Sequence, residues 1–380
     1  MAGIMVVLGT RPEALKLAPV IQALQTRGVN PRVCATGQHD DLLRQALDGS
    51  GIRPDIDLAL MRPEQSLNEL TASLIAGLSS VLAAQQPVRV VVQGDTSSAF
   101  AGALAAYHLK VPVSHVEAGL RSGDTTQPWP EEFNRRAIAA VADQHFAPTT
   151  RAAEALRAEG VSPHAIHLTG NTSIDALLAT RLRIAADPLA CEPVNPVLCA
   201  ARGRRLILFT CHRRENHGAG LAEVTAAIRA LAARPDVLIA VALHPNPAVQ
   251  EPMSAALEDV ANVMLLPPLD YACFVRLLSA AYIVLTDSGG VQEEAPTLGK
   301  PVLILRETTE RMEGVEAGTA RLVGARAQRI VAETCLLLDN PEAHGRMARA
   351  HNPYGDGCAA ERIADILVGE SAPALREREV

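Results

Sequence analysis

Short apolar runs alternate with helical stretches along most of this sequence, and that alternation limits the possible folds more than any other feature. The runs are β-branched, are bounded by turn residues, and lie at 4–9, 32–37, 88–94, 206–211, 237–243 and 282–287. Continuous apolar runs of this length are typical of strands buried on both faces of a parallel sheet. Ala/Leu-rich stretches with helical periodicity lie between them, at 12–26, 97–109, 219–233 and 326–338. The sequence therefore predicts an α/β fold built from doubly wound, Rossmann-like domains.

The chain is long enough for two domains. It has 380 residues, and a single hydrophobic core stops growing at roughly 250–300 residues. The alternation is interrupted near 181–204, where prolines replace the periodic apolar residues. We place an N-terminal domain at 1–175 and a C-terminal domain at 176–356, with a helix at 357–375 that could pack back on the first. Because open α/β sheets bind ligands at the carboxyl ends of their strands, we expect an interdomain cleft lined by loops that follow strands.

Charge and cysteine content argue against several classes of partner. The formal net charge is -7, and no basic run is present, which argues against nucleic acid and anionic membranes. The seven cysteines are scattered without a C-x-x-C pair, a pattern typical of reduced thiols in a cytosol. The amino terminus lacks a basic start, and by composition no apolar stretch is long enough to span a membrane. We therefore expect a cytoplasmic protein.

Two turns that follow strands are candidate phosphate sites. After the first strand, Thr10 could cap a helix that opens at Pro12, which would bring Arg11 and Lys16 near a helix N-terminus. These two cations could instead be solvated, and no G-x-G-x-x-G supports a dinucleotide. The stronger turn joins Ser288, Gly289 and Gly290 to a helix bearing Glu294, whose carboxylate could accept bonds from ribose hydroxyls; the alternative is a tight turn with a solvated Glu294.

Carboxylates and cations follow other strands. Asp95, Glu117 and Glu131 are candidate acids and bases, because an ionised carboxylate at the end of an apolar strand is costly unless it is paired or functional. Asp95 could instead cap a helix, and Glu131 could favour a helix start or pair with Arg135.

A histidine and arginine segment follows the strand at 206–211. There, His212 could bridge a phosphate and help a leaving group depart. Cys211 and His212 are adjacent and point apart, so they make a poor nucleophile pair. The histidines His212, His217 and His244 show no metal-ligand spacing, and we predict no metal site.

The ordered series of motifs resembles the non-hydrolysing UDP-N-acetylglucosamine 2-epimerases, which have a two-domain glycosyltransferase-B type fold. The resemblance covers nearly the whole chain, through GTRPEALKLAPV, TGQHDDLL, QGDTSSAFAGALAAY, HVEAGLRSGD, PWPEEFNRR, LTGNTSIDAL, HRREN, TDSGGVQEEAPTLGKPV, TERMEGVEAGT and NPYGDGCAAERI. It implies catalytic roles for Asp95, Glu117 and Glu131. It also implies that the C-terminal domain is the UDP-binding domain. The family's UDP-binding positions fall on Arg11, Lys16, His212, Phe274, Ser288, Gly289, Gly290, Glu294 and Arg311. We further expect His212 to act in catalysis, and Arg135 and Arg213 to bind substrate.

The resemblance implies the reaction. UDP is eliminated across carbons 1 and 2 of the sugar and added back with protonation on the opposite face, so that UDP-N-acetylglucosamine and UDP-N-acetylmannosamine interconvert without a cofactor. Such precursors serve cell-surface polysaccharide synthesis, and the family suggests a homodimer. Alternatives are a 2-epimerase of a UDP-2,3-diacetamido uronate or a UDP-sugar-dependent glycosyltransferase on the same fold. Asp41 and Glu64 stand where members regulated by a second UDP-sugar carry amide or basic residues, which argues against that regulation.

Overall fold

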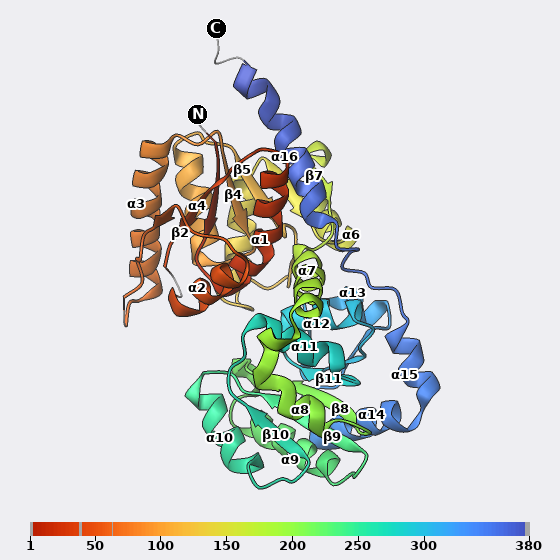
Figure 1. The fold of residues 1–380 in the computed structure, drawn as a ribbon. Helices are drawn as coiled ribbons and strands as arrows, with labels where there is room; N and C mark the ends of the chain where they lie inside the picture. The colour runs from red at the N-terminus through yellow and green to blue at the C-terminus, as the bar shows by residue number, and fades with distance from the viewer. Residues whose placement is uncertain (1–2, 38–39, 63, 377–380) are drawn as a thin grey trace. The chain divides into compact units, whose positions relative to one another are not determined.

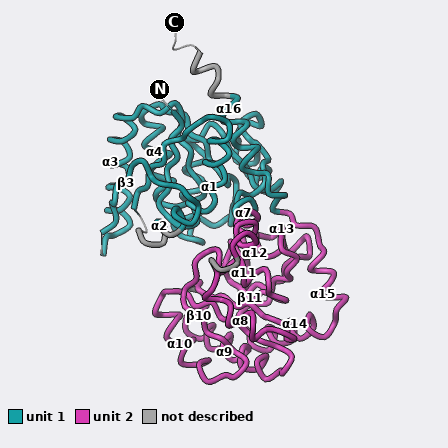
Figure 2. The backbone as a smooth tube through the Cα atoms, viewed as in Figure 1, with its two compact units in different colours: residues 1–176, 354–380 teal, residues 177–353 magenta. Residues whose placement is uncertain are grey.

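The chain forms two compact units, each built on one parallel sheet. The computed structural model describes residues 3–37, 40–62 and 64–376 (Figure 1). Unit 1 comprises residues 1–176 and 354–380, and unit 2 comprises residues 177–353 (Figure 2). The boundary lies inside a helix, and the proline-containing stretch after residue 186 folds within unit 2. Both sheets are fully parallel with helices on both faces, which confirms the doubly wound α/β prediction.

Unit 1 holds a seven-stranded sheet in the order β3-β2-β1-β4-β5-β6-β7. Its elements are β1 Ile4–Leu8, α1 Arg11–Thr26, β2 Arg32–Ala35, α2 Asp40–Gly49, β3 Ile56–Asp57, α3 Leu67–Gln85, β4 Arg89–Gln93, α4 Ser97–His108, β5 Val113–Val116, α5 Glu131–Val141, β6 Gln144–Ala147, α6 Thr150–Ala158, η1 Pro163–Ala165, β7 Ile166–Leu168, the start of α7 Thr172–Ala186, and α16 Ala359–Arg376.

Alternate side chains of the unit 1 strands enter two separate cores. Val6 and Leu8 of β1 pack with apolar side chains of α1, α2 and α16, whereas Met5 and Val7 pack with those of α3 and α4. This is the period of two expected of a strand covered on both faces.

The C-terminal helix α16 belongs to unit 1 and packs beside α1. Ala360, Ile363, Ala364 and Leu367 of α16 lie in the same core as the apolar side of α1. At the rim, Arg27 forms ion pairs with Glu361 and Asp365. The buried apolar face of α16 explains why the last part of the chain folds with the first.

Unit 2 holds a six-stranded sheet in the order β10-β9-β8-β11-β12-β13. After α7 its elements are η2 Pro188–Val194, α8 Asn195–Ala200, β8 Arg205–Thr210, η3 Arg214–Asn216, α9 Ala219–Ala232, β9 Val237–Ala242, α10 Pro247–Leu257, β10 Val263–Leu266, α11 Tyr271–Ala280, β11 Ile283–Thr286, α12 Gly289–Thr297, β12 Val302–Ile304, α13 Met312–Glu316, β13 Ala320–Leu322, α14 Ala327–Asp339 and α15 Pro341–Ala348. Helices α9, α10, α14 and α15 cover one face, and α8, α11 and α12 cover the other.

Each sheet reverses its strand order at one point, and loops that carry candidate residues begin there. In unit 1 the reversal lies between β1 and β4, and in unit 2 between β8 and β11. Loops after neighbouring strands on either side of such a point diverge and leave a crevice for ligands. The fold therefore brings the β1, β4 and β5 loops together in unit 1, and the β8 and β11 loops together in unit 2.

One helix corrects an expectation from the sequence. Among the residues that the structure describes, α3 is long and apolar enough to cross a membrane by length and composition alone, so the chain does contain one such stretch. In the structure, Leu74, Leu78 and Leu82 of α3 pack into the core beneath α4. A reciprocal capping box between Ser66 and Glu69 opens the helix.

Candidate active site

A buried carboxylate, Glu13, joins two loops at the reversal point of unit 1. Its side chain is 0% exposed. One oxygen accepts hydrogen bonds from the Gly9 N–H at 3.0 Å and the Thr10 hydroxyl at 2.8 Å, and the other accepts from the Thr96 hydroxyl at 2.7 Å. Glu13 thereby ties the loop that leads to Arg11 to the loop that carries Asp95.

The start of α1 differs in detail from the sequence prediction. Thr10 occupies the N-cap position, but its hydroxyl donates to Glu13 and does not cap the helix. Arg11 is the first residue of α1, so Pro12 is the second helical residue and not the first. Arg11 is half-buried there.

Burial raises the pKa of Glu13 to about 7 from the ordinary 4.5, and the three donors offset this only in part. Because the unfolded chain releases this proton near 4.5 while the folded chain holds it to about 7, the Glu13 contribution to stability falls as pH rises through that window. We expect the free energy of unfolding of the wild type, relative to Glu13→Gln, to fall by about 3 kcal/mol across it. Denaturant titrations at several pH values measure this, and a difference that stays constant with pH would contradict it.

Lys16 and Glu117 are in direct contact. The Lys16 Nζ lies 2.5 Å from Glu117 Oε2, and the Gln93 side-chain amide donates to the same oxygen at 2.6 Å. Lys16 projects from α1, Gln93 ends β4, and Glu117 follows β5. Glu117 has a φ of 63°, in the left-handed region that non-glycine residues seldom adopt. A backbone held in that region at a polar site is a recurrent feature of catalytic residues.

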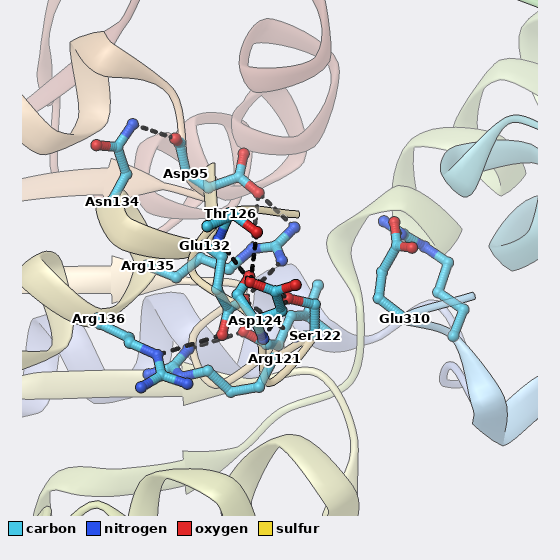
Figure 3. A network of polar contacts seen from close by, with 12 residues as sticks. Asp95, Arg121, Ser122, Asp124, Thr126, Glu132, Asn134, Arg135, Arg136 and Glu310 are labelled. Atoms are coloured by element: carbon cyan, nitrogen blue, oxygen red, sulfur yellow. Dashed lines mark hydrogen bonds and ion pairs between the residues drawn. The ribbon is translucent and has the colours of Figure 1, made fainter. Parts of the chain in front are cut away.

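Asp95 is paired with Arg135 in a network that Figure 3 shows from close by. Arg135 contacts one Asp95 carboxylate oxygen through Nε at 2.8 Å and Nη2 at 2.6 Å, and donates to Glu132 at 3.2 Å. Glu132 is 0% exposed and also accepts from the Ser122 N–H. The capping alternative for Asp95 is wrong, because Thr96 caps α4 by accepting from the Ala99 N–H.

Glu131 is the first residue of α5. Its Oε2 is buried, and no hydrogen-bond partner reaches this oxygen among the described residues. A buried carboxylate oxygen without a donor is costly and marks a place where a ligand or a proton is expected.

In unit 2, His212 follows β8 at the reversal point. Its ring stacks on His244 with centroids 5.1 Å apart. Burial lowers the pKa of His212, while nearby Asp287 raises it in part. Cys211 next to it is buried, and burial together with Asp287 raises the pKa of its thiol, so this thiol is a poor nucleophile.

Arginine side chains gather next to the β11 turn around one carboxylate, Glu310. Arg311 and Arg306 form ion pairs with Glu310, and Arg213 Nη2 lies 3.7 Å from it. Burial raises the pKa of Glu310, but the charges of these arginines outweigh it and hold the pKa well below its usual range. Arg311 also donates to Glu293 at 2.7 Å. These arginines are fixed in advance, which suits a site for phosphate oxygens.

The glycine turn is shaped by Arg311. Ser288 occupies the N-cap position of α12 without a side-chain capping bond. A Cβ on Gly289 would lie 2.6 Å from Arg311 Cζ, whereas a Cβ on Gly290 would meet nothing within 4 Å. A side chain at Gly289 would therefore displace the Arg311 guanidinium from its ion pairs, whereas Gly290 leaves open space at a helix N-terminus, where anions bind.

This difference gives a paired prediction. Gly289→Ala should lower the free energy of unfolding by about 1–3 kcal/mol through overpacking against Arg311, and should weaken UDP binding. Gly290→Ala should leave stability unchanged and weaken UDP binding alone, because its methyl group would occupy the space that a diphosphate needs. Denaturant titration and calorimetry with UDP separate the two effects. If Gly290→Ala bound UDP as tightly as the wild type, the turn would not be the diphosphate site.

Glu294 and Phe274 lie on the helices that follow and precede the Ser288 to Gly290 turn, α12 and α11. Glu294 is buried on α12, and its Oε1 accepts a hydrogen bond from the Tyr271 hydroxyl at 2.9 Å. The alternative of a solvated Glu294 is therefore wrong. Phe274, on α11, is half-buried against the core beneath α11 and α12.

Sequence reasoning assigned no role to several buried groups that hold the candidate residues. They are polar residues that contact another loop or helix, namely Glu13, Gln93, Tyr271, Asp287, Glu293 and Glu310. In the described part of the chain, no cluster of three or more His, Cys, Asp or Glu side chains could hold a metal ion.

Comparisons with known proteins agree with one another. The sequence profile of the family described as UDP-N-acetylglucosamine 2-epimerase matches residues 22–368. A protein of Ralstonia solanacearum described as "Probable UDP-N-acetylglucosamine 2-epimerase" is 49% identical over 370 residues, covering 97% of this chain and 99% of its own length. The UDP-N-acetylglucosamine 2-epimerase of Escherichia coli K12 is 46% identical over 367 residues, covering 96% and 98%.

A solved structure is also similar. The crystal structure of UDP-GlcNAc 2-epimerase from Neisseria meningitidis bound to UDP-GlcNAc superposes with a TM-score of 0.92 at 43% identity, covering 97% of this chain and 100% of that one.

Proposed function

Because the chain belongs to the UDP-N-acetylglucosamine 2-epimerase family, we propose that it interconverts UDP-N-acetylglucosamine and UDP-N-acetylmannosamine. Two findings support this substrate: the Neisseria meningitidis relative is described as bound to UDP-GlcNAc, and unit 2 has a glycine turn at a helix N-terminus beside fixed arginines. The observation that carries the chemistry is the set of three carboxylates of unit 1: Asp95 and Glu117 on loops that follow strands, and Glu131 at the start of α5.

The reaction breaks and remakes one C–O bond. A carboxylate removes the proton from carbon 2, the C1–O bond to UDP breaks with its electron pair on the diphosphate, and a double bond forms between carbons 1 and 2. The reverse addition, with a proton delivered to the opposite face of carbon 2, gives the epimer. Because the carbon 2 proton of an amide sugar is weakly acidic, departure of the diphosphate must assist its removal.

The candidate residues divide into two tasks in this proposal. Asp95, Glu117 and Glu131 carry protons, as positioned carboxylates do in general acid–base catalysis. Arg11, Lys16, Arg213, Arg311 and the Ser288 to Gly290 turn hold the UDP group, together with His212, Phe274 and Glu294, and Arg135 orients Asp95. Holding the expelled UDP makes its re-addition effectively intramolecular.

Proton exchange with solvent tests the proposal. The pure protein is incubated with UDP-N-acetylglucosamine in heavy water without an acceptor or nicotinamide, and the products are followed by NMR. We expect the manno epimer with deuterium at carbon 2. If neither epimer nor exchange appears, the same incubation with a UDP-2,3-diacetamido uronate, and then with a sugar acceptor, tests the two alternative activities.

We propose a homodimer in the cytoplasm, as the family resemblance and the reduced cysteines suggest. Light scattering coupled to size-exclusion chromatography measures the mass against the 40.2 kDa of one chain. A mass near one chain at working concentrations would contradict the dimer.

We expect no activation by a second UDP-sugar. Glu64 is exposed and lines a cavity of about 390 Å³ together with Arg62 and Gln65, and Asp41 lies in helix α2. These two acidic residues oppose the binding of a second anionic nucleotide. Initial rates should therefore depend hyperbolically on UDP-N-acetylglucosamine, and the reverse reaction should start without added UDP-N-acetylglucosamine. A sigmoidal dependence would contradict this expectation.

A further inference from the structure

Asp287 is a fully buried carboxylate to which the sequence assigns no role. It follows β11, is 0% exposed, and lies between the Thr286 strand end and the Ser288 turn. Burying a carboxylate is costly unless donors surround it. Its surroundings therefore show what this carboxylate holds in place.

All the donors come from the loop after β8. Asp287 accepts from the backbone N–H groups of His212 at 3.0 Å and Arg213 at 2.9 Å, and from the Asn216 side-chain amide at 2.9 Å. The Cys211 thiol donates to it at 3.1 Å. Strands β8 and β11 are paired neighbours, with Thr210 opposite Thr286. One side chain from the β11 end thus determines the backbone course of the segment that carries His212.

Asp287 also contacts the His212 ring. The Nδ1 atom of His212 lies 3.3 Å from Asp287 Oδ1. A ring nitrogen next to a carboxylate carries the proton, so the neutral ring has its hydrogen on Nδ1 and its lone pair on Nε2. The ring can donate from Nε2 to a diphosphate only after it takes up a second proton, and a neighbouring carboxylate stabilises that cation.

We propose that Asp287 is the positioning residue of His212: it fixes the ring so that Nε2 points to the departing diphosphate, and it supports the imidazolium form when UDP is bound. This inference rests on the proposed epimerase function and deepens it. Other groups disfavour the charged form of His212: His244 stacks on the ring, and the positive charges of Arg213 and Arg306 lower its pKa. Asp287 is the carboxylate that raises the pKa against these groups.

The test combines kinetics with NMR of the histidine ring. Asp287→Asn should lower kcat about 10- to 100-fold. It should also move the alkaline limb of the kcat pH profile to lower pH, since the imidazolium loses the carboxylate that raises its pKa. With ¹⁵N-labelled histidine, the wild type should show neutral His212 protonated on Nδ1, and added UDP should raise its pKa. The pKa rise should be smaller in Asp287→Asn.

A matched control separates positioning from folding. Asn262 holds a different loop of unit 2, donating to the Ala232 and Arg234 carbonyls at 2.9 and 3.2 Å. Asn262→Ala should therefore lower stability without moving the pH profile or the His212 signals. If Asp287→Asn does not fold, the test rests on the ¹⁵N spectrum of the wild type, which shows which ring nitrogen of neutral His212 carries the proton.

Two results would overturn the inference. One is a wild-type His212 protonated on Nε2 in its neutral form. The other is a folded Asp287→Asn protein with unchanged kcat and unchanged response of His212 to UDP. A wild type that binds UDP with the expected ring signals, yet forms no epimer, would instead count against the proposed function and leave the positioning role supported.

Discussion

Replacing Glu117 with glutamine should lower kcat by about 10²- to 10⁴-fold, the usual contribution of a positioned general acid or base, while UDP binding stays nearly unchanged. The glutamine keeps the size of the side chain and one acceptor oxygen. It removes the charge that faces Lys16 at 2.5 Å and the ability to carry a proton. Steady-state rates and calorimetry with UDP on the same preparation measure the two effects.

The control for Glu117→Gln is Glu159→Gln. Glu159 is a carboxylate of unit 1 that is likewise paired with a cation, Arg121 at 2.6 Å, but it lies at the C-cap of α6. Glu159→Gln should keep the wild-type kcat. Full activity in Glu117→Gln would show that the role of Glu117 is structural and not catalytic.

Arg135→Met should cause the largest loss of stability, about 3–5 kcal/mol, as expected when one partner of a buried ion pair is removed. The Arg135 side chain is 7% exposed, and it neutralises both Asp95 and the fully buried Glu132. The variant should also lose most of its activity, because Asp95 is released from its position. Denaturant unfolding and kcat measure these effects.

Arg136→Met is the matched control, since Arg136 contacts the same Glu132 from a side chain that is 44% exposed. It should change stability by about 1 kcal/mol or less, as exposed pairs do. Equal losses in the two variants would contradict the view that Arg135 is the buried partner on which the network depends.

Much of the fold could be predicted from the sequence because buried parallel strands need unbroken apolar runs. The runs at 88–94 and 206–211 correspond to β4 and β8. Short strands escaped notice for the converse reason: β12 and β13 have three residues each, too few to show a pattern. Helix α7 continues across the unit boundary, so no break in periodicity marks that boundary.

The sequence predicts which positions carry candidate residues, but it does not predict which side chains those residues contact. Loops after strands were found because polar residues there interrupt apolar runs, as at Asp95 and His212. The side chains that hold these loops in place lie far away in the sequence. Glu13 holds the Asp95 loop through Thr96, which is 83 residues away, and Asp287 holds the His212 segment from 75 residues away. Such contacts depend on which strands become neighbours, and local hydrophobic periodicity does not determine the order of strands in a sheet.

The central claim is that the bond between carbon 1 and UDP breaks and re-forms while the enzyme holds both fragments. Positional isotope exchange tests it most directly. UDP-N-acetylglucosamine is labelled with ¹⁸O in the oxygen that bridges carbon 1 and phosphorus, and ³¹P NMR follows the label during incubation. The account predicts that the label moves into non-bridging positions of that phosphate at least as fast as the epimer accumulates. Epimer formation, with the label remaining in the bridge, would contradict it.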